Sequence, residues 1–127
     1  MMNDMKANRS GTSFKRSVCP ITNTLDVVGD KWTLIIIRDL FLGKRLYQEF
    51  LSSPEGISTN ILADRLQRLE KAGLIGKAAY QHSPTRYQYT LTEKGMDLKP
   101  VLEAMLRWAE KYIPGVERFP PQHRRLG

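Results

Sequence analysis

The sequence predicts a mainly helical domain with one small β-hairpin. Apolar residues recur with helical spacing through most of residues 18–113, and the period changes to two between residues 74 and 92. Glycine and proline mark several of the boundaries between these segments. At 127 residues the chain has room for one domain with a small core.

Two helices are expected first. Pro20 suits the first turn of a helix over residues 20–28, and Gly29 ends it. We expect Asp30 to cap a second, strongly apolar helix that stops near Gly43.

A short helix followed by a longer one is expected next. The short helix covers residues 47–52 and breaks before Pro54, because proline forces the preceding residue out of helical geometry. Ser58 is a good N-cap for the longer helix, and Gly73 is its C-terminal stop. Its buried stripe consists of Ile61, Leu62, Leu66 and Leu69, and its outer face and flanks carry Thr59, Asn60, Ala63, Asp64, Gln67, Arg68 and Lys71. Arg65 falls beside the apolar arc and is expected to lie along the side of the helix.

A hairpin and a last helix complete the domain. The strands are expected over residues 74–81 and 86–92, with a polar tip over residues 82–85. We expect Thr92 to cap one long last helix whose apolar stripe exceeds what so small a domain covers. That stripe predicts a second copy as its partner, with the contacts Leu25, Val28, Leu98, Val101, Leu102, Met105 and Leu106.

Helix, turn, helix and hairpin in this order make a winged helix-turn-helix, whose second helix enters the major groove of double-stranded DNA. The expected base contacts are Ser58, Thr59, Asn60, Ala63, Asp64 and Gln67. The expected phosphate or wing contacts are Arg65, Arg68, Lys71, Lys77, His82 and Arg86. A solvated helix face is the alternative for these side chains, and the hairpin directly downstream favours DNA.

Charge and composition agree with a nucleic-acid partner. The formal net charge is +7, and residues 1–18 and 44–91 each contribute +3. A basic protein favours polyanions, although a soluble protein with basic tails is the alternative. The single cysteine excludes an intrachain disulfide and points to a reducing cytoplasm, and no segment resembles a membrane span or a secretory signal.

Enzyme chemistry is not expected. His82 and His123 have no cysteine or carboxylate at metal-ligand spacing, and the chain has neither a phosphate-binding glycine loop nor a nucleophile elbow. We therefore expect no metal and no cofactor.

Several linked motifs resemble the HxlR family of winged helix-turn-helix regulators, which are MarR-like. They are Cys19-Pro20, Gly29-Asp30-Lys31-Trp32-Thr33, Gly56-Ile57-Ser58, Gly73-Leu74-Ile75 and Tyr89-Thr90-Leu91-Thr92 with Gly95. The resemblance covers residues 18–113 and implies a dimer formed by the first and last helices that binds operator DNA. The family often has arginine where this chain has Leu46, and Arg45 is the expected substitute for that phosphate contact. Residues 1–17 are expected to form a flexible basic arm, and residues 114–127 a flexible tail.

Cys19 is a candidate sensor thiol. It precedes Pro20 at a helix start, whose N–H groups favour a thiolate, and Lys15 and Arg16 should act in the same direction. Some members of the family use a cysteine here to sense oxidants or electrophiles, so such a small molecule is a candidate effector. The alternative is that Cys19 is a small buried hydrophobic residue.

For the chain as a whole, the alternative function is an interaction module that binds protein or RNA without operator specificity.

Overall fold

The computed structural model describes residues 15–116, which belong to two units, Met1–Lys31 and Trp32–Gly127. Most of the expected N-terminal arm, most of the expected C-terminal tail and His123 lie outside the described residues.

The first unit contains α1 (Pro20–Val28), with the bounds that the sequence predicted. Cys19 occupies the N-cap position, Pro20 is in the first turn, and the Gly29 N–H donates to the Leu25 carbonyl at 2.8 Å.

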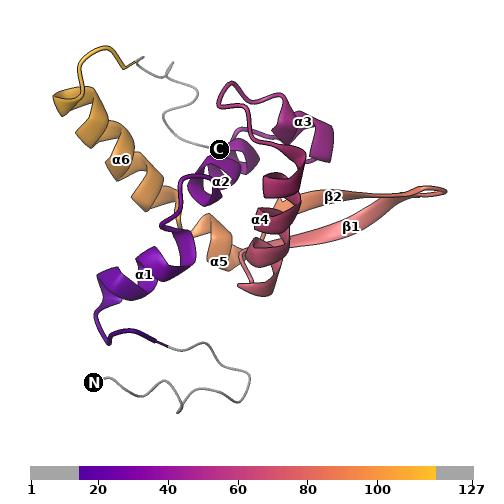
Figure 1. The fold of residues 1–127 in the computed structure, drawn as a ribbon, viewed down its shortest axis with the longest axis horizontal. Helices are drawn as coiled ribbons and strands as arrows, with labels where there is room; N and C mark the ends of the chain where they lie inside the picture. Colours follow the sequence, from indigo (N-terminus) through magenta and orange to yellow (C-terminus); the bar gives the residue numbers. More distant parts are fainter. Residues whose placement is uncertain (1–14, 117–127) are drawn as a thin grey trace. The chain divides into compact units, whose positions relative to one another are not determined.

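The second unit is mainly helical with one antiparallel hairpin, as predicted (Figure 1). Its elements are α2 (Thr33–Phe41), α3 (Tyr47–Leu51), α4 (Thr59–Lys71), β1 (Ile75–His82), β2 (Thr85–Leu91), α5 (Glu93–Met96) and α6 (Lys99–Tyr112). The buried core of this unit consists of Ile36, Ile37, Leu40, Phe50, Ile57, Leu62, Leu66, Leu69, Leu74, Ile75 and Leu102. These residues come from α2, α3, α4, α6 and the start of β1, with Ile57 and Leu74 in the connections before and after α4. Burial of one apolar cluster therefore holds the helices together.

Both ends of α4 follow from the sequence. The Ser58 hydroxyl accepts a hydrogen bond from the Ile61 N–H at 3.2 Å, as expected for an N-cap. At the other end Gly73 has a φ of 79°, which favours glycine, and the Leu74 N–H reaches back to the Leu69 carbonyl at 2.9 Å. This Schellman turn directs the chain from α4 into β1.

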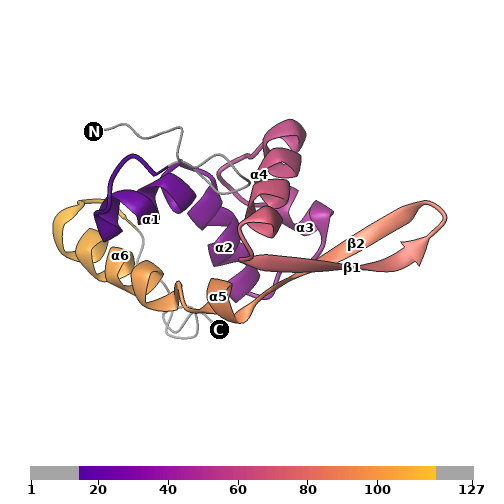
Figure 2. The same cartoon turned by 90° about the horizontal axis from the view of Figure 1, so that it is seen from below.

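The hairpin projects from the helices of the second unit in both views (Figures 1 and 2). Its register runs from Ile75 opposite Leu91 to His82 opposite Thr85, with a bulge between Ala79 and Gln81. Each strand is therefore shifted by one residue towards the tip relative to the expected strands over 74–81 and 86–92, and only residues 83–84 form the tip.

The exit from the hairpin is tied to the end of α4. The Thr92 hydroxyl accepts from the Gly95 N–H at 3.2 Å and donates to the Gly73 carbonyl at 2.6 Å. A Cβ on Gly95 would lie 2.2 Å from the Leu74 carbonyl oxygen, so only glycine fits there. These contacts give a physical reason for the motif Thr90-Leu91-Thr92 with Gly95.

Two expectations about helix ends are wrong. The N-cap position of α2 is Trp32 and not Asp30. The expected single last helix is divided into α5 and α6, with Leu98 at the N-cap of α6. Pro100 explains the division, because a proline N–H is missing and its ring excludes a continuous helix through the preceding turn.

No helix within residues 15–116 is long and apolar enough to cross a membrane.

Candidate nucleic-acid interface

Helices α3 and α4 are joined at the point where α4 begins. The Tyr47 hydroxyl donates to the Thr59 carbonyl at 2.8 Å. At the start of α3, one carboxylate oxygen of Glu49 accepts from the N–H groups of Arg45 and Leu46 at 2.7 and 2.9 Å. These two hydrogen bonds lower the pKa of Glu49. The short helix therefore has a fixed start, and its first residue anchors α4.

The six expected base contacts all lie on exposed positions of α4 or its N-cap: Ser58, Thr59, Asn60, Ala63, Asp64 and Gln67. The opposite side of the helix buries Leu62, Leu66 and Leu69. The structure thus brings the candidate base contacts together on the solvent side, as the helical spacing predicted.

Charges on this face are partly paired. One Asp64 carboxylate oxygen lies 2.6 Å from Arg65 Nη1 and 3.0 Å from Arg68 Nε. The Arg65 side chain is only 18% exposed, whereas the Arg68 side chain is 65% exposed. Lys71 is also exposed. Asp64 therefore offsets part of the positive charge that Arg65 and Arg68 bring to the face.

A cleft of about 490 Å³ separates α4 from the hairpin. Gln67 and Lys71 line it from α4, and Lys77 lines it from β1. Lys77 lies 3.6 Å from Glu70 and stands over the Tyr87 ring at 4.4 Å. Ala63 lines the same cleft, so two candidate base contacts and two candidate phosphate contacts share it.

His82 and Arg86 flank the tip of the hairpin and are exposed. Within residues 15–116 the Arg86 side chain has no hydrogen bond or ion pair. Its guanidinium has no partner among the described residues and is therefore available to bind a ligand.

The Arg45 side chain is already hydrogen-bonded within the protein. Its Nη1 donates to the carbonyls of Leu40 and Lys44 at 2.9 and 2.8 Å, so its guanidinium is bonded at the C-terminal end of α2. A phosphate contact would have to share the guanidinium with these carbonyls.

A buried ionic cluster between α2 and the loop before α4 was not predicted. Asp39 is 2% exposed and accepts from Arg38 Nε and Nη2 at 3.1 and 2.8 Å and from the Ser53 hydroxyl. Lys44 donates to Ser53 at 2.6 Å and lies 3.7 Å from Asp39. Arg38 also holds Glu55 with two bonds of 2.8 and 2.9 Å, and this pairing lowers the pKa of Glu55. The only sequence signal is two neighbouring charges in an otherwise apolar helix.

Cys19 is partly buried at the N-cap of α1. The backbone N–H of Thr22, its hydroxyl and the N–H of Ile21 stabilise the thiolate and lower the pKa of Cys19, as the helix start predicted. Arg16 was expected to lower the pKa of Cys19 further. Its guanidinium instead pairs with Asp26 at 2.6 Å.

The candidate dimer contacts differ in exposure. Val28 and Leu102 are buried, Leu98 and Leu106 are half-buried, and Leu25, Val101 and Met105 are exposed. Trp108 and Tyr112 continue the line of Val101 and Met105 and are each 59% exposed. The uncovered stripe on α6 is therefore Val101, Met105, Trp108 and Tyr112, and the sequence prediction missed Trp108 despite its spacing of seven from Val101.

Among residues 15–116 there is no group of three or more histidine, cysteine, aspartate or glutamate side chains that could hold a metal ion.

A short helix, a loop and an exposed polar helix, followed by a basic hairpin, define a winged helix-turn-helix DNA-binding protein. Comparison with known proteins gives the family. The chain belongs to the HxlR-like helix-turn-helix family, whose pattern matches residues 27–117. This confirms the resemblance and the winged-helix fold, and it places the chain among DNA-binding transcriptional regulators and not among enzymes.

Individual relatives agree with this assignment. The HTH-type transcriptional regulator sll1512 of Synechocystis is 39% identical over 96 residues, which cover 76% of this chain and 71% of that protein. PA1607, a proposed transcription factor, has a similar structure with a TM-score of 0.73 and 38% identity, covering 85% of this chain and 76% of that one. The redox regulator HypR in its reduced form has a TM-score of 0.67 and 33% identity, covering 73% of this chain and 92% of that one.

Proposed function

We propose that the protein binds a specific, near-palindromic operator as a homodimer and thereby regulates transcription. The observation that carries this proposal is the exposed row on α4, which has short polar side chains at the helix start and amides further along. Asn60 and Gln67 lie two turns apart, and each side chain is able to pair bidentately with adenine. Side chains of this kind at the N-terminal end of the helix reach base edges when it enters the major groove.

The proposed phosphate contacts are the cationic side chains around the exposed polar row on α4. Arg68 and Lys71 flank the base contacts, and Lys77 faces them across the cleft. Arg86, which has no partner in residues 15–116, and His82 would contact the backbone or the adjacent minor groove from the hairpin. In the proposed complex α4 lies in one groove and the hairpin tip lies beside it.

Dimerisation is supported by uncovered apolar surface. The α6 stripe exposes Trp108 and Tyr112 by 59% each, and on α1 Ile21 and Leu25 are 71% and 55% exposed. Two copies related by a twofold axis would place their α4 helices in successive major grooves, about 34–36 Å apart, so the operator should have inverted symmetry.

Selection of bound duplexes from a random library tests this function. The expected result is one inverted-repeat sequence, bound as a dimer at least about a thousandfold more tightly than bulk DNA at the same salt concentration. Enrichment of no sequence, with retained binding to a protein or an RNA, would instead identify an interaction module.

A thiol response is the second part of the proposal. HypR is a redox regulator solved in reduced and oxidised forms, and Cys19 has a lowered pKa here. Because the chain has one cysteine, oxidation would have to join two subunits or leave a small adduct on the thiol. We expect diamide or a quinone to weaken operator binding by the wild type and to leave Cys19→Ser unaffected. Equal affinity before and after treatment in both proteins would remove the thiol response without affecting operator binding.

A further inference from the structure

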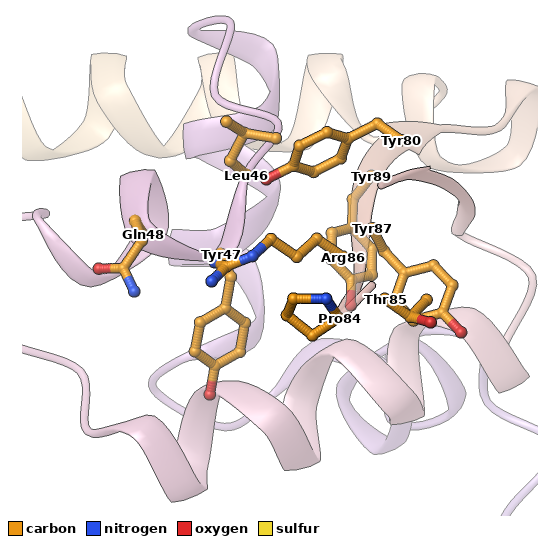
Figure 3. A pocket seen from close by; sticks show the side chains of 9 residues that line it. All are labelled: Leu46, Tyr47, Gln48, Tyr80, Pro84, Thr85, Arg86, Tyr87 and Tyr89. Atoms are coloured by element: carbon orange, nitrogen blue, oxygen red, sulfur yellow. The ribbon is translucent and has the colours of Figure 1, made fainter. Parts of the chain in front are cut away.

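A cavity between α3 and the hairpin concentrates aromatic side chains (Figure 3). Its volume is about 370 Å³, within the range of small-molecule sites. Four of the five tyrosines of the chain line it: Tyr47, Tyr80, Tyr87 and Tyr89. Small-molecule sites are lined mainly by apolar and aromatic side chains with a few polar groups, as this cavity is.

The aromatic walls combine fixed and uncovered rings. Tyr89 packs edge-on against Phe50 with 6.3 Å between ring centroids, and Tyr47 is bonded to α4. Tyr80 and Tyr87 are 47% and 37% exposed. Lys77 stands over one face of the Tyr87 ring at 4.4 Å, whereas the Tyr80 ring has no ring contact or hydrogen bond within the described part of the chain. A flat ring inserted here would cover aromatic surface that the protein leaves open.

The charge of the cavity is uncompensated. Arg86 is the only charged residue among those that line it. Figure 3 shows its side chain extending from the hairpin towards Tyr47. Its guanidinium, unpaired within residues 15–116, is available for a planar anion, which it binds bidentately. The cleft beside α4 differs, since Glu70 there balances part of the charge of Lys71 and Lys77.

We propose that this cavity binds a small aromatic carboxylate, with its ring against Tyr80 and Tyr87 and its carboxylate on Arg86. A DNA phosphate would satisfy Arg86 equally well but would leave the tyrosine rings unused, because a duplex keeps its bases stacked. Since Arg86 is also a proposed wing contact, the bound carboxylate should compete with DNA. That consequence rests on the proposed function, whereas the binding itself does not.

Binding is tested without DNA, by calorimetric titration of the full chain with 2-naphthoate. We expect saturable binding with a Kd of about 1 mM or below, as is reasonable for a ligand of this size. The neutral 2-naphthamide and the non-aromatic cyclohexanecarboxylate should each bind at least about tenfold more weakly, because each lacks one of the two features. Inorganic phosphate binding as tightly as 2-naphthoate would overturn the proposal in favour of a backbone-phosphate site.

Substitutions in the cavity test whether 2-naphthoate binds there. Arg86→Gln should weaken 2-naphthoate binding at least about tenfold, and Tyr80→Ala about threefold to tenfold. Arg68→Gln is the matched control, a cation lost from α4 outside the cavity, and it should bind 2-naphthoate as the wild type does. Amide NMR spectra establish that each variant is folded. Wild-type affinity in both Arg86→Gln and Tyr80→Ala, or no saturable binding by the wild type, would overturn the proposal.

Operator binding supplies the separate readout. At saturating 2-naphthoate the wild type should bind its operator more weakly. Tyr80→Ala, which keeps Arg86, should bind the operator normally and should need about threefold to tenfold more 2-naphthoate for the same loss. If 2-naphthoate binds and no operator exists, the proposed function fails while the site stands. If the operator binds and 2-naphthoate does not, the site fails while the function stands.

Discussion

Replacing Arg38 by methionine should destabilise the domain strongly, because it breaks the buried ionic cluster. The Arg38 side chain is 18% exposed, and its partner Asp39 is 2% exposed. Removing one partner of a buried ion pair costs about 3–5 kcal/mol, since the remaining charge stays desolvated. Lys44, 3.7 Å from Asp39, and the Ser53 hydroxyl remain, so we expect the lower end, about 3 kcal/mol.

Urea unfolding at one protein concentration measures this loss, because dimerisation would make the stability depend on concentration. With a slope of about 1–3 kcal/mol per molar urea, the midpoint should fall by about 1 M or more without a change of slope. In a double-mutant cycle with Asp39→Asn, the coupling should be at least about 1 kcal/mol. Arg16→Met is the matched control, since the Arg16–Asp26 pair is exposed and its loss should leave the midpoint unchanged. A loss below about 1 kcal/mol for Arg38→Met, or one equal to that of the control, would refute the reasoning.

Three further predictions concern DNA and pH. Asn60→Ala should relax discrimination at one or two base pairs by about 1–3 kcal/mol, whereas Arg68→Ala should weaken all DNA alike and reduce the salt slope by about one; the opposite assignment in binding assays would contradict us. Asp64→Asn removes a carboxylate from the α4 face, so the affinity for bulk DNA should rise at about 0.1 M salt, and an unchanged or lower affinity in fluorescence anisotropy would count against it. The pKa of Glu55 is lowered in the folded protein, so its contribution to stability is complete above the unfolded pKa of about 4.3 and is lost as the pH falls through the lower folded value. Glu55→Gln should therefore lose less stability on acidification, which gives a shallower acid unfolding curve. A curve equal to that of the wild type would exclude this contribution.

The fold was predictable from the sequence wherever local rules decide it. Ser58 and Gly73 act within one turn of their own positions, so the bounds of α4 followed from capping chemistry. The division between α5 and α6 was visible in Pro100 but was outweighed by the continuous apolar spacing on both sides.

The candidate site was predictable only in part. Spacing on a helix determines which side chains share a face, so the exposed row on α4 could be found from the sequence. It does not determine what a long side chain reaches in three dimensions. The guanidinium of Arg45 contacts carbonyls at the end of α2, and Arg38 bridges to Glu55, seventeen residues away. Both contacts depend on how α2 packs beside the turn, which no local pattern encodes.

The start of α4 is held from three independent directions. Its own N-cap, Ser58, satisfies the Ile61 N–H; Tyr47 donates to the first helical carbonyl. From α2, the Arg38 guanidinium donates two hydrogen bonds to the carboxylate of Glu55, three residues before the N-cap. The residues proposed to touch bases therefore stand on a segment that is ordered before DNA arrives, and little conformational entropy remains to be lost on binding. It follows that changes at Arg38 should alter the affinity for the operator more than that for bulk DNA, because a displaced helix start loses the base contacts while the flanking cations still reach phosphates.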